Sequence, residues 1–240
     1  MGFFNKGKEK RRQELFGMWE EFKKSGKLCV GELRSIIELK SDLREVAIEE
    51  LFSPTRNFDP KEIINLFEHF EDLRFHNPSW KDVVEKIGLR LISQCPSFEK
   101  LEKFLECHDL PDLNEKVAEF ILQKENVPTK LLGKIVLKVQ EDSLKNGAAE
   151  RILAGEKELP EEDSNVLVWI AVSVKSPLRD KAYEAMLGRT DWKENLLLLF
   201  SMSKHFDNKP FIEKAAKDFL KTENNDEKIL FCIVECVGGD

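Results

Sequence analysis

The sequence has few of the features that mark an enzyme or a membrane-spanning protein. It contains no Cys-X-X-Cys pair, no His-Glu-X-X-His motif, no glycine-rich phosphate loop and no nucleophile elbow. Its longest nearly apolar run, from Val166 to Val174, is far shorter than the roughly 20 residues that a membrane-spanning helix needs. These absences predict a non-catalytic protein without a cofactor, and a buried helix at residues 166–174.

Cysteine and histidine are sparse, with five cysteines and four histidines in 240 residues. The odd cysteine number and the lack of a disulfide-framework spacing are typical of a reducing compartment, so we expect a cytoplasmic protein. Cys232 and Cys236 share a helix face, and Cys107 adjoins His108. Because cysteine is among the residue types most often buried, core packing is favoured over a metal site, and we predict no metal.

Charged residues are abundant, and the formal net charge of −7 describes an acidic protein. This charge argues against broad binding of nucleic acid through phosphate contacts. One local basic line exists, because Lys130, Lys134 and Lys138 recur at every fourth residue and therefore share one helix face. The line is either a docking site for an acidic partner or phosphate, or a solvated face of a lysine-rich chain, and the solvated face is favoured.

A repeated pattern of apolar and small residues organises the chain. In the copy that starts at Leu113, the residues at offsets +4, +5, +8 and +9 are Val117, Ala118, Ile121 and Leu122. The same offsets return apolar or small residues from five other starting points, with spacings of 30 to 40 residues: Leu43, Val83, Leu144, Leu178 and Phe211. Such a period indicates a helical repeat protein.

Residues at these offsets lie on one face of an α-helix, so each copy predicts an amphipathic helix with a buried stripe. Alanine or glycine at +4 or +5 lets a neighbouring helix approach closely. The prediction is an all-α fold, an α–α superhelix formed as a right-handed solenoid of about six helical hairpins with an N-terminal capping helix. Residues 1–40 would form a basic segment and capping helices, and residues 41–240 one repeat array.

Two of the copies resemble a known repeat family. Asp42-Leu43-Arg44-Glu45-Val46-Ala47 and Pro177-Leu178-Arg179-Asp180-Lys181-Ala182 are similar to the opening of the second helix in HEAT repeats. The resemblance covers roughly residues 41–237, although the other four copies lack the arginine and most spacings are shorter than those of HEAT units. It implies a scaffold that binds another protein through its concave or edge surface.

Two later helices carry apolar residues beyond the expected stripe. Trp169 and Val172 do so in the first helix, and Trp192 and Leu198 in the second. An inner helix packed between neighbours explains such composition without a partner. Tryptophan is nevertheless enriched at interface anchors, so these four residues, together with the three lysines, are the candidate partner-binding residues.

An alternative function comes from a second resemblance. Ser79-Trp80-Lys81-Asp82-Val83-Val84 is similar to the Ser-Trp-Trp-Asp-X-Val stretch of HEAT-like DNA glycosylases of the alkylation-repair type. Lys81 stands where that family has its second tryptophan, and Asp82 is equally explained as a helix-capping partner of Ser79. Glycosylase activity or DNA binding therefore remains the alternative to protein binding.

The N-terminal segment combines two aromatic and five basic residues, namely Phe3, Phe4, Lys6, Lys8, Lys10, Arg11 and Arg12. Such a segment can contact an anionic membrane surface. Lys6 replaces the Ser or Thr of the myristoylation pattern. A solvated tail is therefore favoured over peripheral membrane contact.

Overall fold

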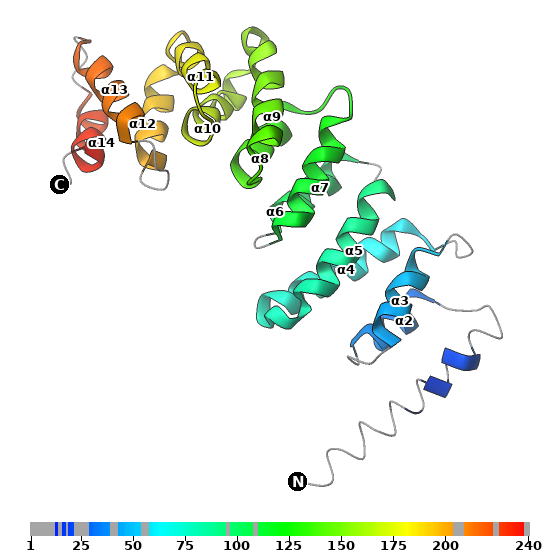
Figure 1. Ribbon diagram of the computed structural model, residues 1–240. Coiled ribbons are helices and arrows are strands. Elements are labelled where there is room, and N and C mark those ends of the chain that lie inside the picture. Colours follow the sequence, from blue (N-terminus) through cyan, green and yellow to red (C-terminus); the bar gives the residue numbers. More distant parts are fainter. Residues whose placement is uncertain are drawn as a thin grey trace, which may run out of the picture. The chain divides into compact units, whose positions relative to one another are not determined.

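The computed structural model describes residues 13, 16–17, 19–21, 29–38, 43–53, 58–94, 97–107, 110–203, 209–222 and 226–237 (Figure 1). These residues form α-helices and short 3-10 helices, and the described ranges contain no β-strand. The all-α fold predicted from the sequence is therefore confirmed. None of the helices in these ranges is long and apolar enough to cross a membrane.

The chain divides into two compact units, residues 1–95 and 96–240. Unit 1 contains α2 (Val30–Glu38), α3 (Leu43–Leu51), α4 (Pro60–His76), the 3-10 helix Pro78–Trp80, α5 (Lys81–Leu91) and the 3-10 helix Ile92–Gln94. Helix α2 packs on α3, α4 packs on α5, and α2 also contacts α4. The sequence instead places a boundary near residue 40, and one array spanning both units stays a prediction.

Helix α4 begins where the sequence indicates a start. The Asp59 side chain accepts a hydrogen bond from the Lys61 backbone N–H at 2.9 Å, and Pro60 occupies the first turn. Proline is well suited there because its missing N–H would have no partner in the helix. Trp19 is fully buried in the core. The aromatic and basic residues from Phe3 to Arg12 lie outside the described residues.

Unit 2 contains nine α-helices among its described residues: α6 (Phe98–Glu106), α7 (Pro111–Leu122), α8 (Thr129–Lys138), α9 (Asp142–Ala154), α10 (Asn165–Ser173), α11 (Leu178–Leu187), α12 (Trp192–Ser203), α13 (Lys209–Leu220) and α14 (Glu227–Val237). Two 3-10 helices, Glu156–Glu158 and Glu161–Asp163, lie between α9 and α10. Sequential helices pack in pairs, and the tightest are α6 with α7, α8 with α9 and α10 with α11.

The pairs of unit 2 stack in two layers. The even-numbered helices follow one another, since α8 contacts both α6 and α10, and α12 contacts both α10 and α14. The odd-numbered helices form the second layer, in which α9 contacts α7 and α11 (Figure 1). Helix α10 is therefore surrounded, and its residues Val166, Leu167, Val168, Ile170 and Ala171 are all buried.

Each copy of the sequence repeat falls on an odd-numbered helix, from α3 to α13. In α7, Leu113, Val117, Ala118 and Ile121 are fully buried, and the corresponding positions of the other copies at +4, +5 and +8 are buried as well. Position +9 differs, because Leu122 and Leu153 are half-buried and Leu220 is exposed. The expectation that Leu153 is a core residue is therefore wrong: it lies at the C-terminal end of α9, where the next helix does not cover it.

Candidate functional site

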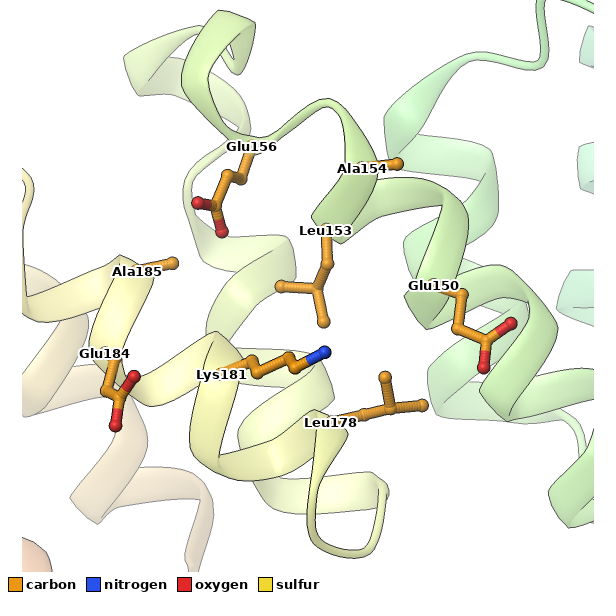
Figure 2. A pocket seen from close by; sticks show the side chains of 8 residues that line it. All are labelled: Glu150, Leu153, Ala154, Glu156, Leu178, Lys181, Glu184 and Ala185. Carbon is orange, nitrogen blue, oxygen red and sulfur yellow. The ribbon is translucent and has the colours of Figure 1, made fainter.

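A groove lies on unit 2 between the C-terminal end of α9, the segment that follows it, and α11. Its volume is 570 Å³. We call it the α9–α11 groove, and eight residues line it: Glu150, Leu153, Ala154, Glu156, Leu178, Lys181, Glu184 and Ala185 (Figure 2). It is an open surface feature that receives side chains from two successive helices of the odd-numbered layer.

A second hollow adjoins the groove and shares Glu156 and Ala185 with it. Its volume is 530 Å³, and its other lining residues come from the α9–α10 link, α10 and the α11–α12 turn: Lys157, Leu159, Leu167, Gly188, Arg189 and Thr190. Together the two hollows follow the link of residues 155–164 along one side of α11. An extended segment of a few residues could lie along both.

The link that forms one wall is held in place by hydrogen bonds to the α11–α12 turn. Arg189 donates to the Leu159 backbone carbonyl at 3.1 Å, and the Thr190 hydroxyl donates to Glu161 at 2.6 Å. Leu159 is itself buried. Because these contacts join the link to the turn within the unit, this wall is already formed before any ligand arrives.

Ser164, at the end of the link, donates its hydroxyl hydrogen to the Asp191 carboxylate, and its hydroxyl oxygen lies 3.3 Å from the Asn195 side-chain oxygen. Burial raises the pKa of the Asp191 carboxyl, but the hydrogen bond from Ser164, further hydrogen bonds and the charge of Arg189 together lower it below its ordinary value. The Asp191 carboxylate is therefore ionised at neutral pH, and both of its oxygens can accept hydrogen bonds. This polar cluster fixes the start of α10 against the start of α12.

The α9–α11 groove combines an apolar floor with an acidic rim. Figure 2 shows the Lys181 side chain extending from α11 toward Leu153 and Leu178, with the carboxylates of Glu150, Glu156 and Glu184 around this centre. Within the described residues these four charged side chains have no ion pair or side-chain hydrogen bond with the rest of the chain. The groove is lined by three carboxylates and one ammonium group, so its net negative charge favours a cationic ligand with an apolar portion.

The three lysines predicted as a basic line do not act as one surface. Lys130 and Lys138 are exposed, whereas Lys134 reaches from α8 to α6 and pairs with Glu106 and, at 2.5 Å, with Glu102. Burial lowers the pKa of the Lys134 ammonium, but the hydrogen bonds and charges of the two glutamates outweigh it and raise the pKa. Lys134 therefore joins two neighbouring helices, and its charge is already neutralised.

The structure places Trp169 and Val172 at a packing surface between helices. Val172 is 1% exposed and belongs to the core. The half-buried Trp169 ring lies over Gly133 of α8, so close that a Cβ atom added there would come within 2.6 Å of the ring. Trp169 and Val172 therefore do not form an exposed groove among the described residues.

Trp192 and Leu198, from the second apolar helix, are both half-buried. The Trp192 ring lies 6.4 Å from the Phe219 ring of α13, measured between centroids, and the Lys193 ammonium lies 5.8 Å from the Trp192 centroid. Trp192 therefore packs α12 against α13 and keeps only part of its surface for a partner. The candidate residues do not converge on one site.

The residues behind the glycosylase resemblance lie in unit 1. Trp80 is 7% exposed, its ring stacks on Phe70 at 5.3 Å, and the Arg44 guanidinium lies 4.8 Å from the Trp80 centroid. The N-cap residue of α5 is Trp80, and the Ser79 backbone N–H donates a hydrogen bond to the Asn77 side chain at 3.1 Å. Trp80 thus has a packing role, and its ring is not presented to a nucleic acid.

The described residues contain no group of three or more His, Cys, Asp or Glu side chains arranged to hold a metal ion. Cys107 is buried, and the Cys236 thiol donates to the Phe200 carbonyl at 3.0 Å. His108, next to Cys107 in the chain, lies outside the described residues. Packing therefore accounts for both thiols.

The groove escapes sequence analysis because its residues come from separate segments and have no motif spacing. The one available signal is the long acidic link between α9 and α10, with Glu156, Glu158 and Glu161. Nothing in the sequence reveals that this link lies beside Lys181 and Glu184 of α11. No family model matches the chain, and no curated protein and no solved structure was found to be similar to it.

Proposed function

We propose that the chain is a non-catalytic helical-repeat scaffold, with its helices arranged as a right-handed solenoid, and that it binds another protein. The paired, two-layered packing of unit 2 supports this proposal, since such stacks expose long grooves between successive repeats. The observation that carries it is the α9–α11 groove, with a wall held in place and charged side chains that have no partner within the described chain.

The ligand that fits the groove is a basic, partly apolar segment of a partner protein. The methylene groups of a lysine or arginine can lie on Leu153 and Leu178 while the cationic head reaches a glutamate at the rim. Arginine is the better fit, because its planar guanidinium can pair with a carboxylate through two hydrogen bonds. The net charge of −7 favours association with such a basic segment.

Selection from a displayed library of random peptides tests the proposal. Immobilised full-length protein should enrich peptides in which Arg or Lys adjoins Leu, Ile or Phe. The selected peptides, labelled with a fluorophore, are then titrated with the protein by fluorescence anisotropy. Because the contacts are partly exposed ion pairs, affinity should also fall as the salt concentration rises.

Two matched double variants distinguish the groove from a general charge effect. Glu150→Gln with Glu184→Gln removes two rim carboxylates, whereas Glu125→Gln with Glu194→Gln removes two exposed carboxylates elsewhere on unit 2. Loss of two charge-assisted contacts worth about 0.7 kcal/mol each should weaken binding roughly tenfold in the first variant only. Enrichment of acidic peptides, or equal affinity of both variants, would overturn the proposal.

A further inference from the structure

Helix α14 packs on the rest of unit 2 with one side only. Ile229 and Ile233 on this side are buried. The Cys236 thiol, on the same side, donates a hydrogen bond to the Phe200 backbone carbonyl of α12 at 3.0 Å. This side of α14 therefore faces the preceding helix of the even-numbered layer.

The opposite side of α14 is apolar and exposed. Phe231 is 63% exposed and Val234 is 68% exposed. Leu230 and Val237, both half-buried, lie beside them, and we call the four residues the α14 stripe. Six other large apolar side chains are exposed among the described residues, and each lies on a different segment: Phe16, Val46, Phe75, Leu89, Leu187 and Leu220. An isolated apolar residue is ordinary on a protein surface, whereas a contiguous apolar patch indicates an interaction site.

In an inner helix of the same layer, the equivalent side is covered by the next helix. Val166 and Trp169 of α10 lie against Gly133 of α8. Val168 and Ala171 lie on the other side of α10, given the 3.6 residues of a helical turn, and both are fully buried. Helix α12 packs on α10 and follows it in the row of even-numbered helices (Figure 1). The α14 stripe is thus the side on which a following helix would pack, and no described helix lies there.

The contact between α8 and α10 also indicates the shape of a helix that fits the stripe. There the Trp169 ring of one helix lies over Gly133 of the other, so a residue without a side chain accommodates an aromatic ring. Phe231 is the aromatic residue of the stripe, and its counterpart on a docked helix is therefore Gly or Ala. The four residues of the stripe include neither, so a second copy of the stripe would offer no recess for Phe231.

We propose that the α14 stripe is the docking site for an amphipathic α-helix of a partner protein, which packs on α14 as α10 packs on α8. The docked helix presents Leu, Ile or Val at the spacing of one helix face, and Gly or Ala where it meets Phe231. This ligand differs from the extended basic segment that fits the α9–α11 groove, so the two sites are tested separately. A single helix on the 11-residue α14 buries less than the roughly 1,200–2,000 Å² of a stable interface. The dissociation constant is therefore about micromolar or weaker.

Selection from a displayed library of designed amphipathic helical peptides tests this proposal on the full chain. The library varies the apolar face, and immobilised protein should enrich peptides in which one small residue is flanked by large aliphatic residues. The enriched peptide, labelled with a fluorophore, is then titrated with the protein by fluorescence anisotropy. Phe231→Ala keeps a strong helix former at the position and should weaken binding about tenfold or more. Phe75→Ala is the matched control, because it removes a phenylalanine that is 84% exposed on α4 of unit 1, and it should leave the affinity unchanged.

A substitution in the peptide distinguishes direct contact with Phe231 from an indirect effect on folding. Leucine in place of the small residue should weaken binding to the original chain about tenfold, because it meets the Phe231 ring. The Phe231→Ala variant has room for that leucine and should bind the two peptides with affinities within about threefold of each other. Equal effects of the peptide substitution on both proteins would overturn the proposal.

Three other results would also overturn it. The first is a selection that enriches no amphipathic peptide, and the second is equal affinity of the enriched peptide for the original chain and Phe231→Ala. The third is a mass in sedimentation equilibrium that rises above 27.8 kDa with concentration for the original chain but not for Phe231→Ala, which would assign the stripe to a second copy. The double variant Glu150→Gln with Glu184→Gln should bind the helical peptide unchanged, and a tenfold loss there would place the peptide in the α9–α11 groove instead.

Discussion

Replacing Gly133 with alanine tests the close approach of α8 and α10 that gives Trp169 its structural role. A Cβ atom at position 133 would lie 2.6 and 2.7 Å from two carbons of the Trp169 ring and 2.8 Å from a methyl carbon of Val166. Real Cβ atoms do not come so near other heavy atoms. Either the two side chains or the two helices must move to accommodate the added methyl group.

The expected magnitude is the balance of two opposing effects. Alanine favours the helix over glycine by about 0.8–1.0 kcal/mol. Overpacking of a closely packed contact costs about 1–3 kcal/mol, and Val166 is stiff because its side chain branches at Cβ. We expect Gly133→Ala to lower the free energy of unfolding by about 1 kcal/mol.

Gly147→Ala is the matched control for this prediction. Gly147 also lies within a helix of unit 2, but an added Cβ would meet only Leu122 Cδ1, at an ordinary contact distance of 3.7 Å. The helix-propensity gain is therefore unopposed, and Gly147→Ala should raise the free energy of unfolding by about 0.8–1.0 kcal/mol. Because that gain is common to both variants, the difference between them measures the steric cost alone.

Guanidinium titration followed by far-UV circular dichroism measures both variants. Both glycines belong to unit 2, so the comparison uses the same unfolding transition even when the two units of the chain unfold separately. The packing argument fails if Gly133→Ala is as stable as Gly147→Ala. In that case Trp169 would not hold α10 against α8, and its surface would again be a candidate for partner binding.

Two further predictions concern a buried phenol and the end of α9. The chain has a single tyrosine, so tyrosinate absorbance reports Tyr183 alone; burial, helped by the charge of Asp218, raises the pKa of Tyr183 to about 12. The contribution of the neutral Tyr183 phenol to the free energy of unfolding is therefore complete below pH ~10 and is lost as the pH rises to about 12. Ionisation of Tyr183 near pH 10 in natively folded protein would contradict its burial. Ile152→Ala should cost about 2–5 kcal/mol in denaturant melts, since Ile152 is 2% exposed. Leu153 is half-buried, so Leu153→Ala should lower the free energy of unfolding by only about 1 kcal/mol. Equal losses for the two variants would show that Leu153 belongs to the core.

The helices and their buried faces were predictable from the sequence because apolar and small residues recur at the same offsets in several copies of the repeat. Val117 and Ala118 recur as Ala148 and Ala149 in α9, and all four are fully buried. Each such pair must meet a neighbouring helix at short range, so small or compact side chains return at the same offsets. One copy would be an ordinary amphipathic segment, but repeated copies determine which residues face the core.

The partners of individual side chains were not predictable from the sequence. The spacing of Lys130, Lys134 and Lys138 places them on one helix face, but it does not reveal that α6 presents Glu102 and Glu106 to the middle lysine. Periodicity describes a single helix, whereas an ion pair between helices depends on their relative rotation and separation. The same limit applies to Trp169, whose position over Gly133 depends on the distance between α8 and α10.

The α9–α11 groove itself follows from one position at which successive repeats differ. Three residues after the start of the repeat, α9 has Gly147, and an added Cβ there would touch Leu122 at the end of α7. The equivalent residue of α11 is Lys181, and both Lys181 and Leu153, the counterpart of Leu122, line the groove. A glycine lets the leucine of the preceding helix close over the next helix, whereas a lysine keeps the two apart and brings a charge into the space. The regular positions of the repeat thus form the core of unit 2, and a departure from the repeat at its outer surface forms the candidate binding site.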